Sequence, residues 1–187
     1  YHFIACDPFH EGTPPKKTVR YLNEVGKAIN NLYENFDKDS TWVMQAWTMR
    51  EHIVKAVPKE RLLILDLNSE KTPQNNNCWG YSVVSGMLHD FGGKNAMQGK
   101  LEKHSKNCYM KLRQNGANVV GSGMFMEGIE QNPVVYDLQF EMLTTSTAID
   151  LDKWLDNYIL RRYGKFDETL RNAWDILLKT CYRSDGY

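Results

Sequence analysis

Short apolar runs alternate along the first two-thirds of the chain with longer segments whose apolar residues recur every three or four positions. The short runs are apolar on both faces, which is typical of strands that are covered by helices in a parallel sheet. They predict five strands, at residues 2–6, 42–47, 62–67, 81–88 and 117–125.

The periodic segments predict helices. Residues 18–36 carry apolar side chains at helical spacing and follow a Pro-Pro pair, which suits the start of a helix. Residues 95–116 predict a second long helix that ends at Gly116. The polar segment 68–80 predicts a long loop. The remaining predicted helices are residues 49–57, 132–143, 150–164 and 167–182.

A strand-helix alternation of this kind predicts an α/β fold with a parallel sheet, either doubly wound or a (β/α)8 barrel. The glycine-rich turn of dinucleotide-binding sheets is missing, because "GSGMFMEG" lacks its spacing. Polar or aromatic residues follow several strands, where barrel enzymes build their sites. These observations favour a partial (β/α)8 barrel, followed after residue 131 by helices of an all-α domain. The strand-end residues are Glu11, Trp47, Asp66, His89 and Glu127.

Composition excludes several classes of function. The formal net charge is zero, which gives no electrostatic basis for binding nucleic acid or an anionic membrane. The apolar runs are too short to span a bilayer. Four cysteines occur without a CxxC pair, so we expect ordinary thiols and neither a metal nor a cofactor. Because the chain begins at Tyr1 inside a strand-like run, we expect it to be part of a longer protein.

Two glutamates follow the first and fifth predicted strands. Glu11 and Glu127 are 127 − 11 = 116 positions apart, and strands four steps apart face each other across the mouth of an eight-stranded barrel. Two opposed carboxyl groups are what glycoside cleavage requires, one to protonate the leaving oxygen and one to meet the anomeric carbon. The alternative is that each glutamate is an ordinary solvated loop residue.

Motifs in order along the chain bear on that choice. "DPFHEG", "MQAW", "LLILDL", "MLHDFGG", "GMFMEGIEQNPVVYDL" and "RRYG" together resemble the α-N-acetylglucosaminidases of glycoside hydrolase family 89. The resemblance runs from about residue 1 to at least residue 182. It implies a retaining exo-enzyme with a (β/α)8-type barrel and an all-helical C-terminal domain. Residues 1–131 would then be the second half of the barrel, and residues 132–187 its last helix and the start of the helical domain.

The same resemblance implies roles for individual residues. Glu11 corresponds to the general acid/base and Glu127 to the nucleophile. His10 stands beside the acid, and Trp47 matches a pocket tryptophan on which a pyranose ring can stack. Without the motifs, His10 and Trp47 would be read as structural residues. The remaining residues expected at the substrate pocket are Leu67, Leu88, His89 and Phe91.

The chain also departs from the family pattern. Asp90 stands where relatives usually have Asn, and Ser85 where they commonly have Trp. The segment "FEMLTTST" lacks the usual apolar-Trp-Arg ending of its helix. These differences leave the reaction class unchanged and bear on substrate preference.

The expected partner is a glycan with a terminal α-linked N-acetylglucosamine. Two alternatives stay open, a catalytically silent carbohydrate-binding relative and another retaining barrel glycosidase. The resemblance implies a lysosomal, secreted or periplasmic location, and a homo-oligomer of the full-length protein stays open as well.

Overall fold

The computed structural model describes residues 2–93, 95–106 and 108–184. Its chain forms two compact units, one of residues 1–86 with 112–121 and one of residues 87–111 with 122–187. We refer to them as the first and the second unit, and each is described by itself.

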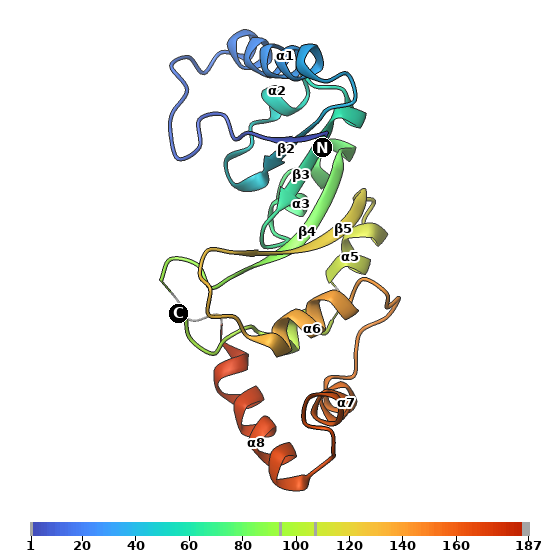
Figure 1. Ribbon diagram of the computed structural model, residues 1–187. Helices are drawn as coiled ribbons and strands as arrows, with labels where there is room; N and C mark the ends of the chain where they lie inside the picture. The colour runs from blue at the N-terminus through green and yellow to red at the C-terminus, as the bar shows by residue number, and fades with distance from the viewer. Residues whose placement is uncertain (1, 94, 107, 185–187) are drawn as a thin grey trace. The chain divides into compact units, whose positions relative to one another are not determined.

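A five-stranded sheet follows the order of the sequence, β1-β2-β3-β4-β5 (Figure 1). The pairs β1–β2, β2–β3 and β3–β4 are parallel, as expected for successive β-α units of a barrel. The predicted α/β barrel-type sheet is confirmed, and each predicted strand agrees with the observed one to within two residues at either end. The strands are β1 Phe3–Ala5, β2 Thr41–Gln45, β3 Leu62–Asp66, β4 Ser82–His89 and β5 Val119–Met126.

The first unit packs one long helix and several short ones beside its strands. Helix α1 (Val19–Phe36) begins at Thr18, whose side-chain oxygen accepts a hydrogen bond from the Tyr21 N–H. Gly26 lets α1 approach α2 (Glu51–Val54) closely, because a Cβ there would lie 2.5 Å from the Ile53 carbonyl oxygen. The other short elements are η1 Ala46–Thr48, η2 Lys59–Arg61, α3 Lys71–Gln74 and η3 Asn77–Gly80.

The second unit is mostly helical and has an aromatic core. Trp154 stacks on Tyr158, Tyr158 meets Trp174 edge to face, and Trp174 stacks on Tyr182. Leu138, Leu155 and Ile159 are fully buried beside them. Its helices are α4 Leu101–His104, α6 Pro133–Glu141, α7 Leu151–Tyr163, α8 Glu168–Lys179 and η4 Cys181–Arg183, and α5 Cys108–Gln114 ends in the first unit.

Three predicted segments differ from the structure. Residues 95–116 contain two short helices, α4 and α5, in place of one long one. The first of them begins only at Leu101, because Gly99 (φ +151°) and Lys100 (φ +44°) leave the right-handed helical region. A Cβ at Gly99 would lie 2.4 Å from the Val135 side chain, so this bend also serves packing. Residues 49–57 form only the short α2, and the predicted loop 68–80 contains α3 and η3.

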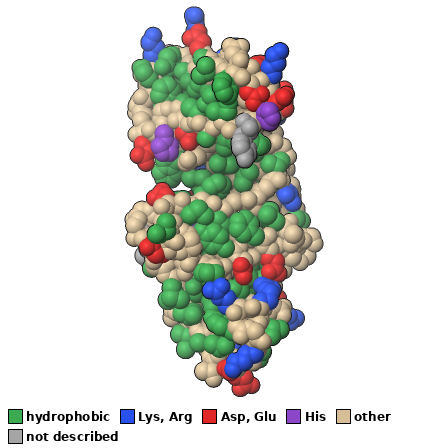
Figure 2. Space-filling view, in the orientation of Figure 1, with side chains coloured by type: hydrophobic (Ala, Val, Ile, Leu, Met, Phe, Trp, Pro, Cys, Tyr) green, Lys and Arg blue, Asp and Glu red, His purple; other side chains and the backbone are tan. Residues whose placement is uncertain are grey.

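Large apolar side chains reach the surface of both units, and hydrophobic surface is spread over the face shown in Figure 2. Phe3 on the edge strand β1 is 65% exposed, and Phe36 at the end of α1 is 82% exposed. A closed barrel has no edge strand. An exposed aromatic side chain on the edge strand β1 is therefore expected when only part of a barrel is present.

Candidate active site

The loop that follows β1 carries the first predicted catalytic residue. Two tight turns shape it, with the His10 N–H donating to the Asp7 carbonyl and the Gly12 N–H donating to the Phe9 carbonyl. Phe9 (φ +58°) and Glu11 (φ +51°) adopt left-handed backbone conformations, which side chains other than glycine seldom do. His10 and Glu11 are both exposed. Such conformations persist only where the surrounding structure stabilises them, so the backbone of this loop is held in one conformation.

Hydrogen bonds tie this loop to the neighbouring strand β2. The Gln45 N–H donates to the Asp7 carboxylate at 2.6 Å, and the Trp42 indole donates to the Cys6 carbonyl at 2.8 Å. The Asp7 side chain therefore connects the start of the loop that carries Glu11 to the end of β2.

Trp47 and Leu67 follow the next two strands of the same unit. Trp47 lies in η1, directly after β2, and is 53% exposed, with the Lys71 Nζ 6.0 Å from its ring centroid. Leu67 is half-buried and directly follows β3. Since β1, β2 and β3 are parallel, Glu11, Trp47 and Leu67 all follow strand ends at one edge of the sheet.

Asp66, another polar strand-end residue, is buried and works as a helix cap. Its carboxylate accepts hydrogen bonds from the Glu70, Lys71 and Thr72 N–H groups and from the Thr72 hydroxyl. Asp66, the last residue of β3, therefore stabilises the start of α3.

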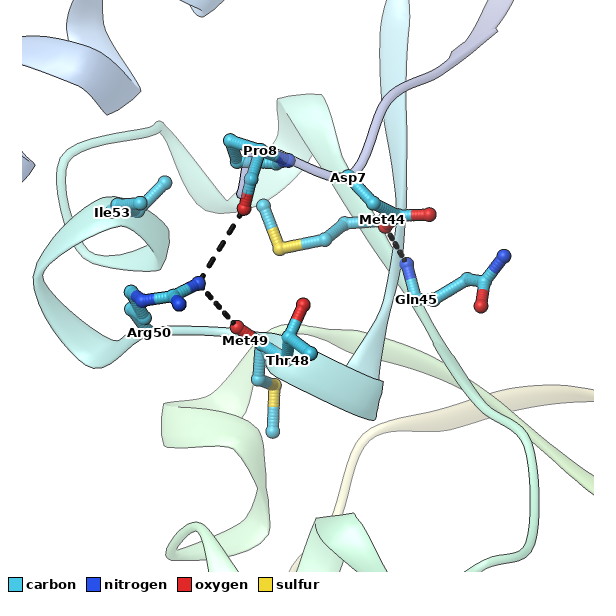
Figure 3. A pocket seen from close by; sticks show the side chains of 8 residues that line it. All are labelled: Asp7, Pro8, Met44, Gln45, Thr48, Met49, Arg50 and Ile53. Carbon is cyan, nitrogen blue, oxygen red and sulfur yellow. Dashed lines mark hydrogen bonds between the residues drawn. The ribbon is translucent and has the colours of Figure 1, made fainter. Parts of the chain in front are cut away.

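A small hollow lies beside the Glu11 loop (Figure 3), with an empty volume of about 190 Å³, open solvent included. None of the predicted site residues lines it. Arg50 extends along the hollow, and its guanidinium donates to the Pro8 and Thr48 carbonyls. The lining residues are Asp7, Pro8, Met44, Gln45, Thr48, Met49, Arg50 and Ile53.

Glu127, the second predicted catalytic residue, lies in the second unit just after β5. Its side chain is exposed, and its Oε2 accepts a hydrogen bond from the Gly92 N–H at 3.0 Å. The backbone N–H groups of Glu127 and Gly128 both donate to the Asp90 carbonyl, at 3.3 and 2.8 Å. A Cβ on Gly128 would lie 2.7 Å from the Asn95 Oδ1 and 3.2 Å from the Asp90 oxygen. The loop after β4 thus holds Glu127 at both its backbone and its carboxylate.

His89 lies in the interior of the second unit. It is 1% exposed, and its Nε2 lies 3.0 Å from the Asn132 side-chain amide, which donates to it. Burial lowers the pKa of His89, and the nearby Asp90 acts in the opposite direction. Asn132 in turn accepts a hydrogen bond from the buried Tyr182 hydroxyl. Contact of His89 with a sugar stays a prediction, as it does for the half-buried Leu88 and Phe91.

Both positions that depart from the family pattern are buried. Asp90 has a left-handed backbone (φ +49°), and its Oδ1 accepts a bond from the Gln98 amide at 3.4 Å. Among the described residues its other oxygen, Oδ2, has no hydrogen-bond partner. The Ser85 hydroxyl is 2.6 Å from that of Ser69. No sequence pattern indicated the contacts of Asn132, Gln98 and Arg50, because their partners are distant in the chain or belong to the backbone.

Across residues 2–93, 95–106 and 108–184, one group of side chains is close enough together to hold a metal ion. This group consists of His2, Asp37 and Asp39 and is largely exposed. The His2 Nδ1 lies 2.6 Å from the Asp37 Oδ2. Cys6, Cys78 and Cys181 are free thiols, and burial raises the pKa of Cys78 to about 11. No helix within these ranges is both long enough and apolar enough to cross a membrane.

Family comparison covers nearly the whole chain. The family model described as "Alpha-N-acetylglucosaminidase (NAGLU) tim-barrel domain" matches residues 1–146. The chain belongs to the α-N-acetylglucosaminidase family. The C-terminal domain model of the same α-N-acetylglucosaminidase family matches residues 154–187.

Individual relatives of the α-N-acetylglucosaminidase family agree with this assignment. The human protein named "Alpha-N-acetylglucosaminidase" is 30% identical over an alignment 200 residues long, gaps included. This alignment covers 99% of this chain and 27% of the relative. A family 89 glycoside hydrolase from Clostridium perfringens in complex with PUGNAc has a TM-score of 0.86 and 32% identity, over 100% of this chain and 21% of that one.

A further structure of the Clostridium perfringens protein carries two glutamate-to-glutamine substitutions. It is described in complex with its substrate, GlcNAc-α-1,4-galactose, with a TM-score of 0.86 and 30% identity over 99% of this chain and 21% of that one. The chain thus spans about a quarter of the length of these relatives and belongs to glycoside hydrolase family 89.

Proposed function

We propose that the full-length protein is a retaining exo-glycosidase that hydrolyses terminal α-linked N-acetylglucosamine from glycans through a covalent glycosyl-enzyme. The observation that carries the proposal is the pair of exposed glutamates on loops whose backbones are fixed by hydrogen bonds, each within a family motif. The relative that is seen with its substrate carries two glutamate-to-glutamine substitutions, nearly as far apart along that chain as Glu11 and Glu127 are along this one.

In this mechanism Glu127 is the nucleophile and Glu11 the acid/base. Glu11 protonates the glycosidic oxygen while a Glu127 oxygen forms a bond to the anomeric carbon, and the bond to the leaving alcohol breaks. Glu11, now ionised, then takes a proton from water as the water oxygen displaces Glu127. The Gly92 N–H and the Asp90 carbonyl support this role by holding the carboxylate and backbone of Glu127 in one orientation.

The remaining predicted site residues would form the sugar pocket. The exposed ring of Trp47 supports stacking on a pyranose ring. His10 would donate to the sugar from its place beside Glu11. We also propose that residues 1–131 belong to the barrel, that residues 132–187 begin the helical domain, and that the protein acts in a lysosome, the periplasm or outside the cell. The apolar wall of this pocket would be formed by Leu67, Leu88 and Phe91, and His89 would add a polar contact to the sugar.

Proton NMR of the first product from an aryl α-N-acetylglucosaminide tests the proposal in the full-length protein. We expect α-N-acetylglucosamine to appear first, since two displacements retain configuration. Glu127→Gln should abolish turnover, whereas the matched control Glu130→Gln, at an exposed position three residues further on, should keep it. A β product would indicate inversion. Sugar binding without turnover would favour the silent relative, and turnover of glycosides that lack the acetamido group would favour another retaining glycosidase.

A further inference from the structure

Arg50 joins the two ends of the loop that carries Glu11. Its Nη2 donates to the Gly12 carbonyl at 3.0 Å, on one side of Glu11. Its Nη1 donates to the Pro8 carbonyl at 3.4 Å, on the other side, and to the Thr48 carbonyl at 3.0 Å. Figure 3 shows the two Nη1 bonds and the position of Arg50 in the hollow. One guanidinium thus brackets the predicted acid/base.

The aromatic residue of the same loop makes a further contact with Arg50. The guanidinium carbon lies 5.6 Å from the centre of the Phe9 ring, within the range of a cation–π interaction. Among the described residues, Arg50 takes part in none of the ion pairs. Its hydrogen-bonding capacity is therefore directed to backbone carbonyls of two strand-end loops.

The backbone that Arg50 holds is one that would relax without support. Phe9 and Glu11 both lie in the left-handed region, where a non-glycine residue is less stable than in the right-handed helical or extended regions. A planar guanidinium with donors in fixed directions suits this task, because it can bind carbonyls on both sides of Glu11 at once. A lysine ammonium at the same place is a single point donor on a flexible stem.

We propose that Arg50 is a positioning residue for the acid/base, which holds the Glu11 carboxyl in place by bridging the Pro8, Gly12 and Thr48 carbonyls. The inference rests on the proposed role of Glu11. The Thr48 carbonyl also directly follows Trp47, so the same side chain links the loop of the acid to that of the predicted pocket tryptophan.

The test compares two substrates by kcat/KM in the full-length protein. A nitrophenyl α-N-acetylglucosaminide needs little protonation to lose its leaving group, whereas a disaccharide with a terminal α-linked N-acetylglucosamine needs a well-placed acid. We expect Arg50→Ala to lower kcat/KM for the disaccharide about ten- to a hundredfold and to change the aryl glycoside much less, because small misplacements of a catalytic group are costly. Arg50→Lys should show a smaller loss with the same substrate bias, and it serves as the variant to use if Arg50→Ala does not fold.

Arg61 offers a matched control. From its place directly before β3 it donates to the Lys38 carbonyl and the Ser40 hydroxyl, both on the loop before β2, and so it links chain segments at the opposite ends of the strands from Glu11. Arg61→Ala should affect both substrates equally, if at all. An equal loss on both substrates in Arg50→Ala would overturn the positioning role.

A double variant separates this inference from the proposed function. If Arg50 acts through Glu11, adding Arg50→Ala to Glu11→Ala should cause no further loss on the disaccharide. Additive losses would refute the positioning role and leave the role of Glu11 intact. If Glu11→Ala itself shows no bias against the disaccharide, the assignment of Glu11 as acid/base fails, whatever Arg50 does.

Discussion

The carboxylate of Glu127 accepts a hydrogen bond from the backbone N–H of Gly92 at 3.0 Å. The loop after β4 therefore holds the end of the side chain, while the Asp90 carbonyl of the same loop accepts the Glu127 and Gly128 N–H groups. A carboxylate held from two directions needs little reorganisation when substrate binds, which suits the nucleophile role proposed for Glu127.

Gly128 is the residue whose replacement should disturb this arrangement most directly. A Cβ there would lie 2.7 Å from the Asn95 Oδ1 and 3.2 Å from the Asp90 oxygen. We expect Gly128→Ala to lower kcat on the order of 10²-fold by displacing Glu127, with little effect on the thermal unfolding midpoint. Gly121→Ala is the control, because its Cβ would meet only Val84 at an ordinary 3.7 Å. Unchanged kcat in Gly128→Ala would show that the loop adapts freely.

The two catalytic roles proposed for Glu11 and Glu127 can be distinguished with azide. Glu11→Ala should still form the glycosyl-enzyme from an activated aryl glycoside, and azide should then release it as the α-glycosyl azide, because azide needs no general base. In Glu127→Ala, azide can act only from the vacated face and should give the β-glycosyl azide. The product anomers are read by NMR, and the opposite outcome in both variants would reverse the roles.

The separation of the two carboxyl groups is a geometric prediction for the full-length protein. Glu11 and Glu127 belong to different units of this chain. A retaining mechanism requires their carboxyl groups roughly 5–6 Å apart across one cleft. A crystal structure of the full-length protein would measure it, and a separation of about 9 Å would instead indicate inversion.

The buried hydrogen bond between Tyr182 and Asn132 should contribute to stability. The Tyr182 hydroxyl donates to the Asn132 Oδ1 at 3.2 Å, and Asn132 also donates to His89 and to the Ala96 carbonyl. Tyr182→Phe leaves a buried acceptor unpaired, which costs about 1–3 kcal/mol. Chemical denaturation measures the loss. Tyr21→Phe, at a half-buried residue whose hydroxyl makes no hydrogen bond among the described residues, should cost less than about 0.5 kcal/mol as the control.

His104 should make the protein less stable in mild acid. Burial, followed by the charges of Lys103 and Lys100 and by His89, lowers its pKa to about 4, and its Nδ1 has no partner among the described residues. Since the unfolded pKa is about 6.5, the unfolded chain binds more protons between these values, and the free energy of unfolding falls as the pH drops from about 6.5 to 4. The loss is at most about 3 kcal/mol.

A substitution isolates this effect. His104→Gln should flatten the dependence of the unfolding midpoint on pH between 7 and 5 relative to the unsubstituted protein. The exposed His2 offers the control, since His2→Gln should leave the acid loss in place. An equally steep loss in His104→Gln would assign it to other groups.

The sequence predicted most where one strong local pattern decided the structure. The apolar spacing of α1 gave its bounds to within one residue, and doubly apolar runs gave the strands. It failed at residues 95–116, where the pattern was helical but Gly99 and Lys100 take left-handed conformations, with Gly99 packed against Val135. The local helical pattern there is overridden by tertiary packing, which cannot be read from the spacing of apolar residues.

In the candidate site, too, local motifs were readable from the sequence and tertiary contacts were not. The motifs pointed to Glu11 and Glu127, but the groups that hold their loops were not visible. Arg50 and Asn132 act on backbone carbonyls or on residues distant in the chain, so their spacing carries no signal. Asp66 shows the opposite error, because a strand-end carboxylate that suggested a site caps α3 instead.

The chain-order arrangement of the parallel strands bears on how this scaffold can evolve. In β1, β2 and β3, neighbours in the sheet are also neighbours in sequence, so the strand-end loops follow one another along the sheet in the order in which the chain encodes them. The stretch after β3, residues 67–80, carries Leu67 and Lys71, whereas the loop with Glu11 is encoded elsewhere. Recombination or insertion within residues 67–80 can therefore alter this part of the proposed sugar pocket and leave the loop of Glu11, the proposed acid, unchanged, a modularity that makes the fold open to new specificities.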